Sequence, residues 1–224
     1  MPYAWAKFVA PDLAHNLVAN NAESIMHRLS MPTFAQGLNK VPEVTVSFWI
    51  IKVLCSSIGE TGADFLGSSA YLGLNVARAA TATLLVVALF WQLRKQHYTP
   101  WIYWLTVIFL SVVGAQIADL LTDELDVSLY VSTSVIAMTL AAIFALWYVL
   151  ERSLSIYEIC TRRRELFYWS VILCAFTLGT VGGDLVTEVL HLSFTWGTVG
   201  FGALIMATYL AWRLGGNAVL TFWV

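Results

Sequence analysis

Six apolar segments fill most of this sequence, and each is long enough to cross a membrane as a helix. A membrane-spanning helix needs roughly 20 predominantly apolar residues. Only 12% of the residues are charged and 59% are hydrophobic, whereas a soluble domain carries about 25% charged residues. Lipid offers no hydrogen bonds to the backbone, so such segments must be helical. The sequence therefore predicts an all-α polytopic membrane protein with spans at 44–66, 72–94, 101–122, 129–150, 166–187 and 196–214, and a seventh segment that begins at 217.

Positively charged residues gather in the loops at one end of these segments. The opposite loops contain acidic residues but no Lys or Arg. Because positive loops stay in the cytoplasm, we expect the N-terminus to be cytoplasmic. The positive loops hold Lys40, Arg94, Lys95, Arg152, Arg162, Arg163, Arg164 and Arg213, and the opposite loops hold Asp123, Glu124, Asp126 and Glu188.

The first 40 residues differ from the rest, since they are more polar and contain Pro2, Pro11 and Pro32. They lack the apolar core of a signal peptide. Pro11 favours the first turn of a helix, and apolar residues are loosely spaced for an amphipathic helix after it. We expect residues 1–40 to be a cytoplasmic or interfacial segment, with an arm without fixed structure as the alternative.

An internal repeat relates three of the predicted spans. The stretches FWIIKVLCSSIGETGAD, YWLTVIFLSVVGAQIAD and YWSVILCAFTLGTVGGD each begin with an aromatic residue followed by Trp. Gly follows ten residues after each Trp and Asp fifteen residues after it, without gaps. Each unit is two spans long, so successive copies have the same orientation around an axis along the membrane normal. The predicted repeats are 44–94, 101–150 and 166–214, and 217–224 opens a fourth with Phe222-Trp223.

The shared aspartates are predicted to lie inside the membrane near its outer face. A helix rises about 1.5 Å per residue, so the fifteen residues from Trp to Asp span about 22 Å of a core ~30 Å thick. Carboxylates at this depth are costly and are candidates for function. Glu60 lies one turn deeper than Asp64 and is replaced by Ala115 and Thr180 in the other repeats. The candidate cation- or proton-binding residues are Asp64, Asp119, Asp184 and Glu60, and the three aspartates are also a tentative metal-binding set.

Each of these features has a second interpretation. The aspartates could be hydrated at the interface or bonded to backbone groups. Lys52 could be a counter-charge to a buried carboxylate, or it could extend toward the cytoplasm. Arg78 could pair with Asp64 or face the outer surface. The shared glycines could allow helices to approach closely or mark a broken helix, and these helix-packing candidates are Gly59, Gly114 and Gly179.

Three stretches carry a resemblance to a known family: KVPEVTVSFWIIKVLCSSIGETGADFL, PWIYWLTVIFLSVVG and TRRRELFYWSVILCAFTLGTVGGDL. The sequence resembles, over residues 40–224, a bacterial family of uncharacterised "membrane-anchored proteins" built from a membrane repeat of unknown function. The resemblance implies a multi-pass protein of the bacterial inner membrane with four repeats, of which this sequence contains three and the start of a fourth. It implies no substrate.

Composition and motifs narrow the function further. The net charge of −2 argues against nucleic acid as a partner. No nucleophile elbow, HExxH, phosphate-binding loop or dinucleotide motif appears, so we expect neither an enzyme nor a cofactor apart from a bound cation. We expect a transporter of a small cation, a proton or a divalent metal, through a carboxylate-lined site. The alternative is a non-transporting subunit of a larger membrane complex. The expected partners are membrane lipid, the cation, and either further copies of the chain or a larger complex.

Overall fold

The computed structural model describes residues 39–42, 44–68, 73–189, 191, 193–214 and 218–223. The predicted N-terminal segment 1–40 therefore lies outside the described residues except for its last two. The described part is all α-helical, without strands. Its helices are α2 (Val46–Ser68), α3 (Leu74–Arg94), α4 (Pro100–Asp119), α5 (Leu129–Glu151), α6 (Arg162–Asp184), α7 (Phe194–Arg213) and α8 (Ala218–Trp223), with short helical turns at Leu120–Glu124, Ile156–Glu158 and Leu185–Val189.

The prediction of an all-α polytopic membrane protein is confirmed. Four of the described helices are long and apolar enough to cross a membrane: Leu74–Arg94, Pro100–Glu124, Leu129–Glu151 and Arg162–Val189. The helix α2 has the length of a span but carries Lys52, Glu60 and Asp64. The helix α7 contains a shorter apolar stretch, Thr195–Ala211.

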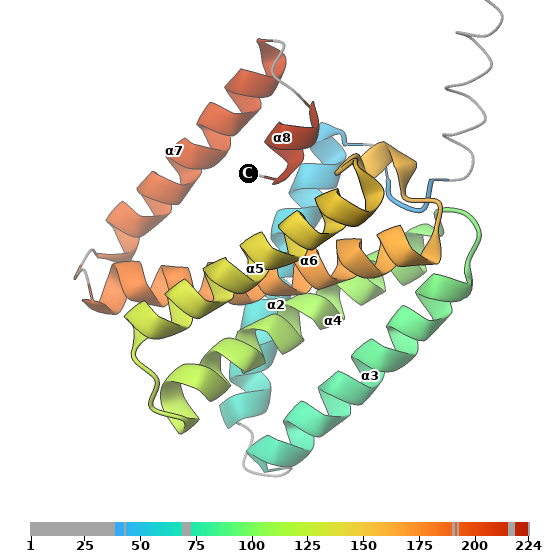
Figure 1. Ribbon diagram of the computed structural model, residues 1–224. Coiled ribbons are helices and arrows are strands. Elements are labelled where there is room, and N and C mark those ends of the chain that lie inside the picture. The colour runs from blue at the N-terminus through green and yellow to red at the C-terminus, as the bar shows by residue number, and fades with distance from the viewer. Residues whose placement is uncertain are drawn as a thin grey trace, which may run out of the picture.

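The repeat divides the helices into an inner and an outer set. The inner helices are α2, α4 and α6, and α4 packs against both of the others (Figure 1). The outer helices α3 and α5 pack against α4 and α6, respectively. All three outer helices begin 25 residues after the repeat Trp, at Leu74, Leu129 and Phe194. The gap-free alignment of the sequence therefore holds in the structure over both helices of each unit.

Glycine sets the close approach of neighbouring inner helices. A Cβ atom on Gly59 of α2 would overlap the side chain of Ser111 on α4. A Cβ atom on Gly114 of α4 would come within 2.8 Å of Phe176 Cβ on α6. Ser111 and Phe176 are both seven residues after the Trp of their repeat. The same helix crossing therefore occurs twice: the glycine ten positions after one Trp packs against the residue seven positions after the Trp of the next repeat. Small residues are common at such helix contacts in membranes.

Aromatic pairs join the starts of the inner helices into a closed ring, which we call the aromatic collar. The first residue of each pair contacts the Trp of the next repeat. Ring centroids are 5.5 Å apart for Phe48 and Trp104 and 5.4 Å apart for Tyr103 and Trp169. Two further contacts close the ring through α8: Tyr168 to Trp223 at 6.0 Å, and Phe222 back to Trp49 at 6.3 Å.

The collar defines a pseudo-four-fold axis through the bundle. The first residue of each pair is almost completely buried, with an exposed fraction of 1% for Tyr103 and Tyr168 and 3% for Phe48 and Phe222. The hydroxyls of Tyr103 and Tyr168 are 2.5 Å apart and share a hydrogen bond. Tilted aromatic contacts of this kind are favourable beyond their buried area. The short helix α8 thus occupies the fourth position of a ring that the first three repeats leave open.

A buried ion pair lies at the same end as the collar. Lys40 Nζ is 2.5 Å from Glu165 Oε2, and the exposed fractions of the two side chains are 6% and 1%. Gln92 Nε2 donates to the other oxygen of Glu165 at 3.3 Å. The sequence suggested only a role in orientation for Lys40. In the structure Lys40 joins the segment before α2 to the first turn of α6.

Candidate functional site

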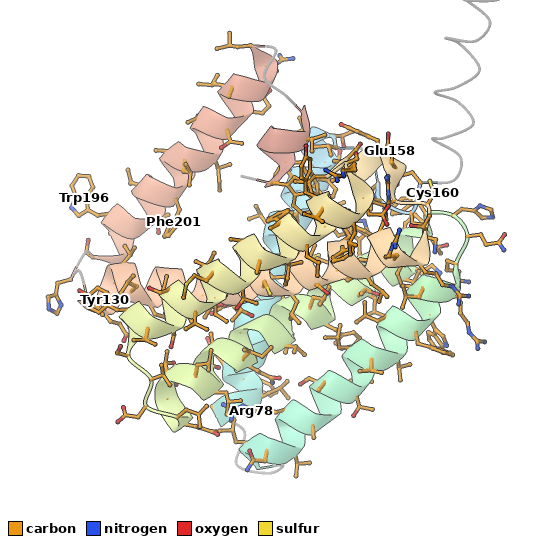
Figure 2. All side chains as sticks on the ribbon, viewed as in Figure 1. Arg78, Tyr130, Glu158, Cys160, Trp196 and Phe201 are labelled. Carbon is orange, nitrogen blue, oxygen red and sulfur yellow. The ribbon has the colours of Figure 1, made fainter. Side chains whose placement is uncertain are left out.

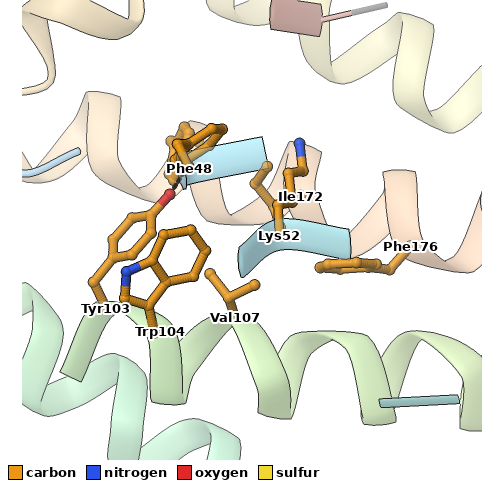
Figure 3. Close-up of a pocket in the computed structure, with 8 residues that line it drawn as sticks. Phe48, Lys52, Tyr103, Trp104, Val107, Ile172 and Phe176 are labelled. Atoms are coloured by element: carbon orange, nitrogen blue, oxygen red, sulfur yellow. Dashed lines mark hydrogen bonds between the residues drawn. The ribbon is translucent and has the colours of Figure 1, made fainter. Parts of the chain in front are cut away.

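Some residues that lie the same number of positions after the Trp of their repeat face the pseudo-four-fold axis together. Just inside the collar lies a cavity of about 10 Å³, which is at the lower limit for one water molecule. Its walls come from α2, α4 and α6, as Figure 3 shows. The residues three positions after each Trp, Lys52, Val107 and Ile172, all line it.

Lys52 is the charged member of this set. Its ammonium lies over the rings of Phe222, Trp49 and Phe48 at 5.1, 5.3 and 6.0 Å from their centroids. Such contacts attract a cation electrostatically. No ion pair joins Lys52 to a carboxylate among the described residues. The side chain therefore extends toward the collar, and the counter-charge role remains a prediction.

Glu60 reaches the axis at the other end of the inner helices. Its Oε2 accepts a hydrogen bond from Thr180 Oγ1 at 3.3 Å. Both residues are eleven positions after their Trp, but they belong to the first and third repeats, which lie opposite each other in the collar. The hydrogen bond therefore crosses the pseudo-four-fold axis. The repeat alignment singles out Glu60 as an acid that the other two repeats lack, but it does not predict Thr180 as its partner.

The predicted aspartates gather around Glu60 at what we call the acidic end. Asp64 follows Glu60 by one turn of α2, and Asp119 and Asp184 are the last residues of α4 and α6, respectively. Because the starts of these three helices meet in the collar, the four candidate residues lie at the same end of the bundle, away from the collar.

Two of the three aspartates end their α-helix in the same way. After Asp119 and Asp184 the chain forms a π-helical turn, at Leu120–Glu124 and Leu185–Val189, respectively. The helix α2 continues past Asp64 to Ser68 without such a turn. Single π-turns of this kind are frequent at functional sites, and the sequence did not predict them.

The tentative metal set does not form a metal-binding group. In the part of the chain that the structure describes, no three His, Cys, Asp or Glu side chains lie close enough together to hold a metal ion. The three aspartates therefore do not form a three-carboxylate ion site in this arrangement.

Other polar residues near the acidic end pair between helices. Arg78 forms an ion pair with Glu124, and not with Asp64 as one interpretation of the sequence had it. Arg78 lies at the opposite end of the bundle from Glu158 and Cys160 (Figure 2). Thr81 Oγ1 of α3 donates to Gln116 Oε1 of α4 at 2.6 Å, and this bond is buried. These contacts fasten α3 to α4 and to the π-helical turn that follows it.

The glycines of the repeat differ in their surroundings. Gly59 and Gly114 lie at helix crossings, as expected for packing residues. Gly179 is exposed, and a Cβ atom on it would meet no atom of the described residues within 4 Å.

Comparisons with known proteins agree with the repeat. The family model described as Repeat of Unknown Function (DUF347) matches three segments, residues 47–98, 102–153 and 167–215. No curated protein and no solved structure matches the chain. The matched segments cover more than half of the sequence and coincide with the three two-helix units of the fold, and the chain therefore belongs to the DUF347 repeat family.

Proposed function

We propose that this multi-pass membrane protein moves a small cation, and that the cation is a proton. The observation that supports this most directly is the Glu60 carboxylate bonded to Thr180 across the pseudo-four-fold axis. Three aspartates lie at the same end of the inner helices, in a chain that has few charged residues. Carboxylates at membrane depth are expensive to keep and are typical of proton relays.

A proton fits this arrangement better than a divalent metal ion. Ca²⁺ takes six or more oxygen ligands at about 2.3–2.6 Å, and the described residues bring no three suitable side chains together. A proton needs only one carboxylate at a time. A group of carboxylates that repel one another also favours binding one proton between them.

The collar end supplies the barrier in this proposal. The cavity inside the collar is too small for more than one water molecule. The positive charge of Lys52 lies beside it, between the collar and Glu60 in the sequence of α2. A cation held at the acidic end would therefore meet both a steric and an electrostatic barrier before it could leave at the collar end.

A second function is favoured by a different observation. One flank of the bundle, at Gly179 and along α7, is uncovered. A non-transporting subunit of a larger membrane complex would use such a flank for assembly, and its carboxylates would then serve only to bind neighbouring groups.

Flux through reconstituted protein separates the two functions. The protein is inserted into liposomes that contain a pH-sensitive dye, and a proton gradient is imposed. We expect proton entry above that of empty liposomes, and we expect Glu60→Gln to return it to that background. Asp126→Asn is the matched control, because Asp126 is an exposed carboxylate in the loop at the same end.

Two results would contradict transport. Wild-type flux equal to that of empty liposomes, with correct insertion shown by protease digestion, would leave the subunit function. If Glu60→Gln and Asp126→Asn change the flux equally, the acidic end is not the proton path.

A further inference from the structure

One connection at the collar end is longer than its counterpart in the first repeat. Residues 95–99 join α3 to α4, whereas residues 152–161 join α5 to α6. We call the second connection the long loop. The first repeat connects its outer helix to the next inner helix without these extra residues, so the repeat itself does not require them.

The long loop has a fixed inner face. Ile156 and Ile159 are 1% and 0% exposed and belong to the hydrophobic core at the collar. Two backbone carbonyls of the loop also accept hydrogen bonds from other segments: Leu154 O from Trp223 Nε1 at 3.1 Å, and Ile159 O from Lys40 N at 3.4 Å. The loop is therefore held in one arrangement, and its charged outer face is held with it.

The acidic groups of this region are used by ion pairs within it. The two oxygens of the Glu151 carboxylate accept separate hydrogen bonds, from Arg163 Nε at 2.5 Å and from Arg164 Nε at 2.8 Å. Glu158 Oε2 accepts another from Arg164 Nη1 at 2.8 Å. Two acids are thus balanced by two arginines, and the pairs hold the end of α5 beside the start of α6.

Two further arginines adjoin these pairs and are not balanced. Arg152 directly follows Glu151, and Arg162 directly precedes Arg163. Both are exposed, and neither guanidinium has an ion pair or hydrogen bond among the described residues. Because the bond from Arg163 to Glu151 brings the two chain segments together, the two free positive charges come from neighbouring positions on α5 and α6.

The backbone does not explain why residue 152 is an arginine. Arg152 ends α5 in the left-handed conformation, with φ 55° and ψ 13°. Helices commonly end in this conformation with glycine, which adopts it without the steric cost of a Cβ atom. The arginine is therefore at a disadvantage in backbone conformation, and its exposed charge is the property that remains to be explained.

The free charges lie where the lipid-facing surface of α5 and α6 ends. Leu150, two residues before Arg152, is 47% exposed, and Leu166, four residues after Arg162, is 54% exposed. Large apolar side chains that are exposed on a membrane-spanning helix face the lipid tails, whereas basic residues next to a span lie at the head groups and attract anionic lipids. Figure 2 shows Glu158 and Cys160 of the long loop at this end of the bundle.

We propose that Arg152 and Arg162 together bind the phosphate of one anionic phospholipid, whose acyl chains lie along the exposed apolar side chains of α5 and α6. A guanidinium presents two parallel N–H donors that match the oxygens of a phosphate. The shorter connection offers no equivalent pair, because the guanidinium of Arg94 lies over the ring of Phe90, 4.3 Å from its centroid, and the next residue is Lys95. This inference does not depend on cation transport.

Native mass spectrometry of the 224-residue chain, released from detergent micelles that contain phosphatidylglycerol, counts the bound lipid. We expect one phosphatidylglycerol per chain at low lipid concentration and at least about tenfold weaker binding of phosphatidylcholine, whose own cation opposes the arginines. Arg152→Gly and Arg162→Gln should each weaken phosphatidylglycerol binding by about tenfold through the loss of charge-assisted hydrogen bonds. Lys95→Gln is the matched control, since Lys95 is an exposed cation at the same end, and it should leave binding unchanged.

Arg152→Gly also separates lipid binding from folding. Glycine suits the left-handed backbone at this position, so without lipid the unfolding midpoint in detergent should stay the same or rise. Added phosphatidylglycerol should raise the midpoint of the wild-type chain but not that of Arg152→Gly. Equal binding of the two lipids by the wild-type chain, or equal losses in Arg152→Gly and Lys95→Gln, would overturn the proposal. Displacement of the lipid by millimolar inorganic phosphate would assign the arginines to a free anion and would also overturn it.

Discussion

The buried pair of Lys40 and Glu165 gives a direct test of the packing at the collar end. Both side chains are shielded, at 6% and 1% exposed, and their charged atoms are 2.5 Å apart. Lys40 Nζ has one further contact, to the carbonyl oxygen of Leu93 at 3.4 Å. Replacing Glu165 by Leu would therefore leave the ammonium without a compensating charge. Breaking such a buried pair costs about 3–5 kcal/mol, and we expect this loss for Glu165→Leu and for Lys40→Met.

The double variant should be more stable than either single one. An apolar pair of similar volume removes both charges at once and is often neutral or better. Gln92 sets the residual cost, because its Nε2 loses Glu165 Oε1 as an acceptor and its Oε1 already lacks a partner among the described residues. An unsatisfied buried amide costs about 1–3 kcal/mol. We therefore expect the double variant to lose about 1–3 kcal/mol.

Reversible unfolding in mixed detergent micelles, followed by Trp fluorescence, measures all four proteins of the cycle. Arg163→Met serves as the control, since its pair with Glu151 has an Arg side chain that is 63% exposed, and exposed pairs contribute about 0–1 kcal/mol. Single variants that lose less than about 1 kcal/mol would show that water reaches the pair. Losses that simply add in the double variant would show that the two side chains do not interact.

Three further predictions concern the repeat, the collar and the orientation. Gly114→Ala should cost about 1–3 kcal/mol of unfolding free energy, because its Cβ would lie 2.8 Å from Phe176 Cβ. Gly179→Ala should leave the unfolding free energy unchanged. Equal losses at both positions would contradict the assignment of the helix crossings. Tyr103→Phe should lower the unfolding free energy by about 1–2 kcal/mol, because it removes a buried hydrogen bond. The double variant Tyr103→Phe with Tyr168→Phe should lose less than the single variant. A double variant that loses more would show that the hydroxyls have other essential partners. In intact bacterial cells a membrane-impermeant maleimide should react with Ser128→Cys but not with Cys160, and Cys160 should react only after lysis. Partial burial raises the pKa of the Cys160 thiol, so both labelling reactions are run at mildly alkaline pH. Labelling of Cys160 in intact cells would reverse the predicted orientation.

The membrane class and the repeat could be predicted because both depend on local chemistry. Each predicted span is an apolar run, and such a run must be helical in lipid because its backbone groups can find hydrogen-bond partners only within the segment. The repeat columns were visible because packing needs Gly at one crossing and aromatic residues at one end. The alignment also placed the outer helices, which begin at the same distance from Trp in all three units.

Side-chain pairing could not be predicted in the same way, because it depends on contacts between distant segments. Lys40 and Glu165 are 125 residues apart, and the sequence indicates for Lys40 only a role in orientation. The sequence offers Asp64 as one partner for Arg78, but the π-helical turn after Asp119 brings Glu124 to it instead. The aromatic residue before each Trp is visible in the sequence as a repeat column, but its contact with the Trp of the next repeat joins residues 55 or more positions apart and cannot be read from a local pattern.

The axis explains why only one repeat carries the deeper acid. The residues eleven positions after Trp face each other across the axis, as the hydrogen bond between Glu60 and Thr180 shows. Two carboxylates about 4 Å apart repel by about 4 kcal/mol at an effective dielectric constant of 20. A symmetric set of acids at this level would therefore oppose the packing of the inner helices. One acid with a hydroxyl opposite and Ala115 beside it avoids this cost. Four residues further on, where the three aspartates lie, they do not come close enough to hold an ion together, so the repeat can keep its acid in every copy. The same restriction holds inside the collar, where the positions equivalent to Lys52 in the other two repeats are the apolar residues Val107 and Ile172. When equivalent residues pack this closely around the axis, a charged residue fits there in only one repeat, and the other repeats must carry uncharged residues at the same position.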